Sequence, residues 1–417
     1  MSSATSTLPT YAEASALVAS HFERSRAVRR VVELVKLEAA SGRVLAAPLQ
    51  ADADQPPFAR STRDGYACRA AELTHGRALP VAGSTRAGEP PAGALPTGAA
   101  WEIMTGAPVP DGADCVVMLE HVAIENGSIR TEEGRRISSG DNVVPQGAQA
   151  RKGDQLLPVG TRLSFAQIAL AAACGHEALA VFTKPRVAIL TTGDEIVPVS
   201  TVPGPSQIRN SNGPMLASMV AAAGGEPIVL PITADDATAL DGAIAEARKA
   251  ELILITGGVS AGKFDLVEPA LARAGAKFHF TGVRIQPGKP LVFGEIPGAD
   301  AVIPFFGLPG NPVSSAVTFS LFSAPLLAAI GGSSEVGPRF AAACLARDAG
   351  KQGKGGLTRF LPARYTFSGS AHLPEVELVP WQGSGDIAAM ARANCFMVLE
   401  DDAAHPEPGA MVRILLI

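Results

Sequence analysis

A glycine-rich turn occupies residues 256–265, with the sequence TGGVSAGKFD, between an apolar run at 252–255 and a helix-like segment at 266–274. This order predicts a buried parallel strand, a turn and a helix N-terminus, where unpaired N–H groups and the helix dipole favour an anion. Gly257, Gly258 and Gly262 would let a ligand approach the backbone closely. Ser260 adds a hydroxyl, and Asp265 offers a carboxylate that suits a metal between phosphates. An isolated turn of this kind fits a plain strand-to-helix connection equally well. The surrounding sequence therefore decides between an anion-binding site and a plain turn.

The surrounding chain, residues 183–332, alternates between strand and helix patterns. We expect strands at 187–192, 228–233, 252–255, 278–283 and 301–306, and helices at 212–223, 237–250, 266–274 and from 312 to about 330. Asn212 and Asn311 suit helix caps, and Pro312 suits a first helical position. This is a doubly wound α/β domain, which binds ligands at the carboxyl ends of its strands. Glycine and charged residues gather at these ends, at 191–195, 235–236, 257–265, Lys289 and 307–311.

Shorter β-prone runs flank the α/β domain on both sides. Residues 55–146 alternate such runs with glycine and proline turns, which predicts an inserted small β domain. Residues 7–54 and 147–182 predict a discontinuous helical linker domain, in which a helix from a T-x-x-E capping box at 10–13 to about residue 21 lies beside a helix at 165–174. Residues 336–417 predict a small C-terminal β domain.

The composition excludes several classes of protein. The net charge is −5, with 35 basic and 40 acidic residues, and no basic run suits nucleic acid. The five cysteines form no C-x-x-C pair, and the seven histidines show no metal-ligand spacing, which fits a reducing cytoplasm without disulfides or structural zinc. The polar N-terminus resembles no signal peptide. An uncharged stretch at 301–334 is broken by proline and glycine, so we expect buried structure rather than a membrane span.

The polar residues at the strand ends indicate a particular chemistry. The chain has no Cys or Ser nucleophile with a His partner, no G-x-G-x-x-G and no G-K-[ST]. The remaining chemistry is binding of a phosphorylated ligand by backbone groups and Lys289, with Asp265 and Asp236 as candidate ligands of Mg²⁺. Glu195 and Asp64 are candidate acid, base or metal-orienting carboxylates. Each of these residues also has an ordinary structural explanation. Asp64 could form an Asx turn, Glu195 could interact with the dipole at a helix start, and Lys289 could be a solvated turn residue.

Six motifs carry a resemblance that covers nearly the whole chain. They are STRDGYA at 61–67, MTGAPVP at 104–110, TGDE at 192–195, GGVSAG at 257–262 with Asp265, PGKP at 287–290 and GLPGNPVS at 307–314. In this order and spacing they resemble the molybdopterin molybdenumtransferase family, the group of MoeA and the gephyrin E domain.

The resemblance implies a four-domain, elongated homodimer with an active cleft shared between subunits. It implies that adenylylated molybdopterin is bound, molybdate is inserted at the dithiolene, and AMP is released with Mg²⁺. Other molybdenum-cofactor biosynthesis proteins are implied as partners. The implied catalytic residues are Asp64 and Thr105, reaching into the partner's cleft, and Glu195, Asp236 and Lys289. The implied metal ligands are Asp265 and Glu195, and the implied substrate-binding residues are Gly257, Gly258, Ser260, Gly262, Pro287, Gly288, Gly307, Pro309, Gly310, Asn311, Arg359 and Ser384.

The chain departs from the family pattern at a few positions. The family often has one basic and two acidic residues at the positions of Val144, Ala148 and Gln149. Lys is frequent in the family at the position of Gln286, and Ser is frequent at the position of Ala389. Arg63 replaces an apolar residue before Asp64. Two alternatives therefore stay open beside the transferase: a molybdopterin adenylyltransferase or nucleotide hydrolase on the same α/β domain, and a non-enzymatic dimeric scaffold. The motifs do not distinguish molybdenum from tungsten, because both arrive as tetrahedral oxyanions.

Overall fold

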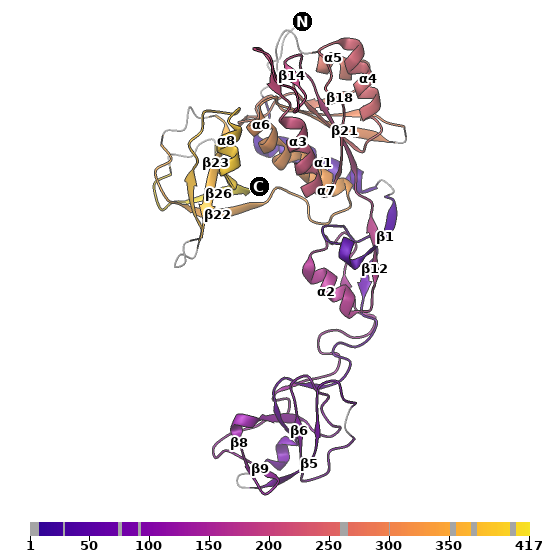
Figure 1. The fold of residues 1–417 in the computed structure, drawn as a ribbon, viewed down its shortest axis with the longest axis vertical. Coiled ribbons are helices and arrows are strands. Elements are labelled where there is room, and N and C mark those ends of the chain that lie inside the picture. The colour runs from indigo at the N-terminus through magenta and orange to yellow at the C-terminus, as the bar shows by residue number, and fades with distance from the viewer. Residues whose placement is uncertain are drawn as a thin grey trace.

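The computed structural model describes residues 8–27, 30–73, 77–90, 93–258, 266–299, 301–350, 356–367, 373–400 and 406–417. The molecule is elongated (Figure 1), with an α/β domain and the C-terminal β domain at one end and the inserted β domain at the other. A slender linker domain connects the two ends. Ser260, Gly262 and Asp265 lie outside the described residues.

The α/β domain contains a six-stranded sheet in the order β16-β13-β17-β21-β20-β18. Its strands are β13 (Arg186–Thr191), β16 (Glu226–Val229), β17 (Leu252–Thr256), β18 (Lys277–Phe280), β20 (Val292–Pro297) and β21 (Val302–Leu308), and its helices include α3 (Asn212–Ala222), α4 (Ala237–Ala247) and α5 (Val267–Arg273). Alternate residues of β17 enter different cores: Leu254 packs with Leu216 of α3, whereas Ile253 packs with Leu240 of α4. The sheet is therefore covered on both faces, as the doubly wound prediction requires.

One edge of this sheet differs from the prediction. Strands β16, β13, β17 and β21 are parallel, but β20 pairs antiparallel with both β21 and β18. No strand is predicted at 292–297, a run that directly follows a glycine and proline loop and is joined to β21 without an intervening helix. A short connection of this kind gives an antiparallel pair, so the sheet is mixed.

The apolar segment after β21 forms one continuous helical stretch in the core. It comprises α6 (Pro312–Thr318), a π-helical turn at Phe319–Ser323 and α7 (Ala324–Ile330). Residues Pro312–Ile330 are long and apolar enough to cross a membrane, but 78% of the apolar window is buried inside this structure. The π-helical turn ends just before Pro325, which has no N–H to continue regular helical hydrogen bonding.

The N-terminal helix α1 (Tyr11–Ala27) packs on the α/β domain. Its capping box is confirmed, because Thr10 N donates to Glu13 Oε2 at 2.8 Å and Glu13 N donates to Thr10 Oγ1 at 3.3 Å. Ala14 and Val18 are buried in the same core as residues of α7. The prediction that this helix lies beside residues 165–174 is therefore wrong. An apolar helix face shows that a helix is buried, but it does not show against which core.

The linker domain joins segments that are far apart in the chain. Strand β1 (Val32–Lys36) pairs antiparallel with β12 (Ala178–Phe182), and β2 (Leu49–Gln50) pairs with β11 (Gln155–Leu157). Helix α2 (Phe165–Ala173) packs here, since Ala171 shares a core with Leu45 and Val181. The residues between these paired segments form the inserted domain.

The inserted domain is all-β apart from short 3₁₀ turns, which include Ala70–Glu72 and Leu119–His121. A six-stranded sheet has the order β7-β4-β6-β5-β9-β8, from β4 (Gly65–Cys68), β5 (Leu79–Thr85), β6 (Ala100–Ile103), β7 (Cys115–Met118), β8 (Val122–Glu125) and β9 (Ser128–Thr131). At its base, β3 (Arg60–Ser61) pairs with β10 (Val143–Val144).

The C-terminal domain is a small β barrel attached to the α/β domain. Its strands are β22 (Phe340–Leu345), β23 (Thr358–Thr366), β24 (Glu375–Leu378), β25 (Cys395–Leu399) and β26 (Met411–Leu416), with α8 (Ile387–Arg392). Pairing of β23 with both β24 and β25 closes the sheet. The short strand β19 (Ile285–Gln286) comes from the α/β segment but pairs parallel with β23, which fixes the barrel beside the carboxyl ends of the main sheet.

Candidate functional site

A cleft of about 1180 Å³ lies at the carboxyl ends of β13, β17 and β21. It is where the sequence analysis expects a ligand in a doubly wound domain. The predicted site residues that line it are Glu195, Gly257, Gly258, Pro287, Gly288, Lys289, Pro309, Gly310, Asn311 and Ser384. Residues from four separate stretches of the α/β segment and from the barrel therefore meet at one site.

The turn after β17 requires glycine for two reasons. Gly257 has φ +93°, in the region that L side chains avoid, and a Cβ atom there would lie 2.3 Å from the backbone oxygen of Thr192. Gly258 also has a positive φ, +59°. The turn from β17 consequently passes directly over the turn from β13, and backbone rather than side chains forms this part of the cleft.

Asn212, predicted from the sequence to cap a helix, lines the cleft in the structure. The N-cap position of α3 belongs to Ser211, which makes no side-chain capping bond. Asn212 Nδ2 instead donates to Thr256 Oγ1 at 2.8 Å and to the carbonyl oxygen of Gly310 at 2.7 Å. The amide thereby joins the ends of β17 and β21. Sequence spacing could not show this, because an Asn at a helix start commonly caps the helix.

Two buried acceptor atoms on the cleft wall have no hydrogen-bond partner among the described residues. They are Thr192 Oγ1 and Asn212 Oδ1, and both residues are at least 90% buried. An amide oxygen can only accept a hydrogen bond, and both Nδ2 hydrogens of Asn212 already have acceptors, so its Oδ1 requires a donor from outside the described residues. An unsatisfied buried polar atom costs about 1–3 kcal/mol, so these atoms indicate that a polar ligand belongs here.

The barrel contributes a polar wall to the cleft. Asn311 Nδ2 donates to Ser384 Oγ at 2.9 Å, and Val313 N donates to the Ser384 carbonyl at 3.1 Å. Asn311 stands at the predicted N-cap of α6 with Pro312 in the first turn, but its side chain makes no capping bond. The Asn311 amide therefore holds the barrel against the α/β domain.

Arg359 and Gly307 do not line the cleft themselves. Arg359 is 7% exposed, and its Nε donates at 3.1 Å to Gln286 Oε1, which does line the cleft. Gly307 is buried within β21, opposite Ile255 and Val292. The loop thus contributes from Pro309 onward, and Arg359 acts on the cleft through Gln286.

Acidic side chains gather at the end of β13. Glu195 lines the cleft, and Asp194 Oδ1 accepts a hydrogen bond from Asp235 N at 3.1 Å. Burial, followed by the charge of Asp194, raises the pKa of Asp235. Asp236 has another role: its Oδ1 accepts from Ala239 N at 2.9 Å and caps α4, away from the cleft lining.

Asp64 and Thr105 meet each other in the inserted domain. Asp64 Oδ1 accepts hydrogen bonds from Thr105 N at 2.6 Å and from Thr105 Oγ1 at 2.8 Å. The backbone N–H of Thr105 lowers the pKa of the carboxyl group. Strand β6, which ends just before Thr105, lies at the opposite end of the molecule from the α/β domain (Figure 1), so the pair does not line the cleft of its own chain.

The fold and cleft together define a class of protein. It is a multidomain protein in which a doubly wound α/β domain receives a polar ligand at its strand ends, and in which a β barrel completes the site.

Comparison with known proteins identifies the family. Family models match the MoeA N-terminal region (domain I and II) at residues 9–175, a "probable molybdopterin binding domain" at 188–329, and the MoeA C-terminal region (domain IV) at 350–417. Proteins named molybdopterin molybdenumtransferase are similar: that of Nostoc sp. is 40% identical over 72% of this chain and 70% of its own, and that of Haemophilus influenzae is 33% identical over 92% and 93%. The crystal structure of the MoeA protein of Pyrococcus horikoshii OT3 is 28% identical, covers 99% of this chain and 100% of its own, and superposes with a TM-score of 0.78. The chain belongs to the MoeA, or molybdopterin molybdenumtransferase, family.

Proposed function

We propose that this protein is a molybdopterin molybdenumtransferase. It binds adenylylated molybdopterin in the cleft, inserts molybdate at the dithiolene and releases AMP with Mg²⁺. The observation that carries this proposal is the similarity over nearly the whole chain to relatives of that name, including the Bacillus subtilis protein, which is 34% identical over 94% of this chain. The cleft supports it with a donor and acceptor set suited to a phosphorylated, polar ligand.

Two groups of described cleft residues are suited to different parts of the ligand. Lys289 lines the cleft, is exposed, and has no ion pair among the described residues, so its ammonium is available to a phosphate. Elsewhere in the cleft lining, Asn212 Oδ1 would accept a hydrogen bond from an N–H or O–H group of the ligand, and the Thr192 hydroxyl would accept or donate one. The ligand would thus satisfy two buried atoms that have no partner within the described part of the chain.

The acidic end of β13 fits Mg²⁺. Asp194, Glu195 and Asp235 supply the hard oxygen atoms that Mg²⁺ prefers, and the raised pKa of Asp235 reflects burial next to negative charges that a cation would balance. Among the described residues, these carboxylates do not bring three ligand atoms together, so water and phosphate oxygens would have to complete the coordination of Mg²⁺. When bound, Mg²⁺ would polarise a phosphoryl oxygen and offset its charge. Asp265, the other metal ligand predicted from the sequence, lies outside the described residues.

The Asp64 and Thr105 pair is proposed to act in the cleft of a partner subunit. Both residues are exposed, they hold each other in a fixed geometry, and they lie far from the cleft of their own chain. A homodimer arranged so that each inserted domain reaches the other chain's cleft would give these residues a function. We propose that the dimer forms in the cytoplasm and works with other proteins of molybdenum-cofactor biosynthesis.

Release of AMP from adenylylated molybdopterin by the purified protein tests this function. We expect release to require both molybdate and Mg²⁺. AMP release without molybdate would instead indicate a nucleotide hydrolase, and ligand binding without any release would indicate a scaffold. Tungstate in place of molybdate measures which oxyanion the cleft prefers.

A further inference from the structure

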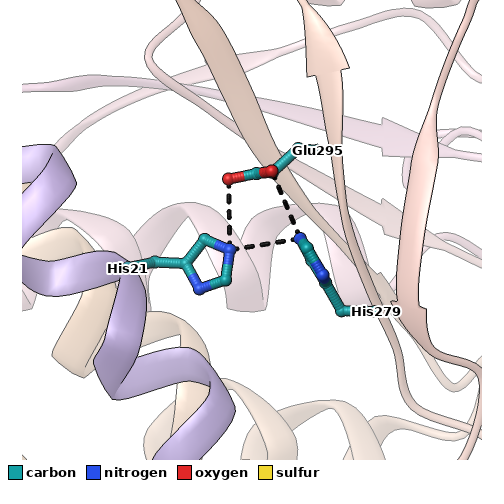
Figure 2. Close-up of side chains that lie close together, drawn as sticks. All are labelled: His21, His279 and Glu295. Atoms are coloured by element: carbon teal, nitrogen blue, oxygen red, sulfur yellow. Dashed lines mark hydrogen bonds and ion pairs between the residues drawn. The ribbon is translucent and has the colours of Figure 1, made fainter.

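Three metal-binding side chains that do not line the cleft lie close together. His21 of α1, His279 of β18 and Glu295 of β20 point their ligand atoms at one another (Figure 2). His21 Nε2 lies 3.1 Å from both His279 Nε2 and Glu295 Oε1, and His279 Nε2 lies 3.3 Å from Glu295 Oε2. The two histidines are 258 residues apart in the sequence, which is why no spacing motif indicates the cluster.

We propose that His21, His279 and Glu295 form a zinc site that joins the N-terminal helix to the edge of the α/β sheet. Two imidazole nitrogens and one carboxylate are a ligand set that Zn²⁺ prefers, with water in the fourth position. In a tetrahedral zinc site with bonds of about 2.0–2.1 Å, ligand atoms lie about 3.3 Å apart. The separations of 3.1 to 3.3 Å observed here are close to that value.

The hydrogen bonds around His21 set its nitrogen for metal binding. Its Nδ1 lies 2.9 Å from the carbonyl oxygen of Leu17, which only accepts, so Nδ1 carries a proton. Ser20 Oγ lies 3.3 Å from the same nitrogen. A neutral His21 consequently directs the Nε2 lone pair at the other two ligands. Such a bond from the second ring nitrogen to a carbonyl is common for metal-bound histidine, because it fixes the ring.

The surrounding elements hold the three side chains in place. The exposed fractions of the side chains are 5% for His21, 12% for His279 and 11% for Glu295. The ring of Phe293 packs against both imidazoles, with centroids at 4.9 and 5.2 Å. A register shift between Phe278 and Phe280 places a bulge at His279, and bulges redirect side chains out of the regular alternation.

Arg24 is the cationic neighbour of this cluster. Its Nη1 lies 3.3 Å from Glu295 Oε1, and its side chain is 58% exposed. A guanidinium with this much solvent access can turn away when an ion binds. Arg24 therefore balances the Glu295 charge in the metal-free protein and opposes zinc only weakly. An Arg24→Gln substitution should strengthen zinc binding.

Metal binding by the full-length protein tests the proposal directly. Protein stripped with a chelator would be titrated with Co²⁺, followed by visible absorption, and then with competing Zn²⁺, with bound metal measured by mass spectrometry. We expect one tightly held ion per chain and visible bands typical of four-coordinate cobalt. Excess Mg²⁺ should not compete, because Mg²⁺ selects oxygen ligands, so this site and the proposed cleft magnesium respond separately.

Substitutions identify the ligands. His21→Gln, His279→Gln and Glu295→Gln should each weaken Zn²⁺ binding at least about 100-fold, since loss of even an indirect partner weakens binding about 10–100-fold. The matched control is His121→Gln, which removes a histidine that pairs with a single carboxylate, Glu132. It should bind zinc as the unsubstituted protein does. Zinc should also raise the unfolding temperature by about 5 °C at saturating concentration, and only when the three ligands are intact.

Two results would overturn the zinc site. One is a stripped, unsubstituted protein that takes up no zinc above the level of surface binding. The other is stoichiometric zinc binding that survives all three ligand substitutions. Circular dichroism on each variant identifies any that fails to fold, and the titration of the unsubstituted protein decides the question even then.

Discussion

The cleft and the histidine cluster lie in one α/β domain but are built in opposite ways. The cleft is open, about 1180 Å³ in volume, and lined by glycine turns, an exposed lysine and polar atoms that have no hydrogen-bond partner among the described residues. The histidine cluster is small, and its side chains already contact one another within 3.1 to 3.3 Å. A large polar ligand requires dispersed groups, whereas a single ion requires convergent ones. Substitutions in the cleft should therefore alter activity, and substitutions in the cluster should alter metal content and stability.

The largest effect is expected at Asn212, because this residue both links two strand ends and lines the cleft. Asn212→Ala removes two hydrogen bonds between the ends of β17 and β21 and the acceptor Oδ1. We expect unfolding free energy to fall by about 2–3 kcal/mol, because buried partners lose their hydrogen bonds. We expect kcat/KM for AMP release to fall by about 100-fold or more, because the cleft walls shift. Steady-state kinetics and urea unfolding measure the two effects. Unchanged kinetics in a destabilised variant would remove Asn212 from the site.

Lys289→Ala separates activity from stability. The lysine is exposed in the cleft and forms no ion pair among the described residues, so its loss should leave unfolding free energy unchanged within about 0.5 kcal/mol. A charged hydrogen bond to the ligand contributes about 1.5–3 kcal/mol, so kcat/KM should fall about 10–100-fold. The matched control is Lys249→Ala, whose lysine is 69% exposed and pairs with Glu246. Equal kinetics in both variants would contradict the phosphate-binding role.

Gly257→Ala tests whether backbone forms the cleft wall. An added Cβ atom would lie 2.3 Å from the Thr192 oxygen, at a φ of +93°. We expect a loss of about 1–3 kcal/mol in unfolding free energy, together with reduced AMP release. Gly242→Ala is the matched control, because it lies in α4 with no atom within 4 Å of the added Cβ. It should stabilise the protein by about 0.5–1 kcal/mol. Similar unfolding curves for the two variants would show that the turn relaxes freely.

Several residues that line the cleft can be placed at strand ends from the sequence, because strand-end turns are local features. Gly257, Lys289 and Asn311 each follow or adjoin a recognisable strand or turn, and parallel strands bring such ends together. The placement of α1 and the zinc cluster could not be predicted in the same way. Ala14 and Val18 could be buried against any apolar surface of the protein, and the sequence does not show that this surface belongs to the α/β domain. His21 and His279 meet through tertiary packing alone, across 258 residues.

The sequence also misjudged residues whose side chains have competing uses. Asn212 has the position and type of a helix cap, but the amide satisfies Thr256 and Gly310 instead. Asp236 was a candidate for the cleft, but it caps α4 through Ala239 N. Cap and site residues are drawn from the same short polar set, so only the folded structure separates them.

The smallest expected effect concerns the exposed Asp64 in the inserted domain. Hydrogen bonds from Thr105 N and Oγ1 lower the pKa of Asp64 in the folded protein. A carboxylate with a lowered folded pKa stabilises the fold above its unfolded pKa, and this contribution is lost as pH falls through the folded value. We therefore expect a slight decrease in unfolding temperature in the acid range, which Asp64→Asn should reduce. Calorimetry over an acid pH series measures it, with Asp111→Asn, an exposed turn residue of the same domain, as the control. In the AMP-release assay, Asp64→Asn should lower the activity more than Asp111→Asn does. The reason is that Asp64→Asn removes a carboxylate proposed to reach the partner's cleft, whereas Asp111→Asn removes no such group. Normal AMP release by the Asp64 variant would show that Asp64 and Thr105 only stabilise their own turn. It would contradict the proposal that Asp64 acts in the partner's cleft.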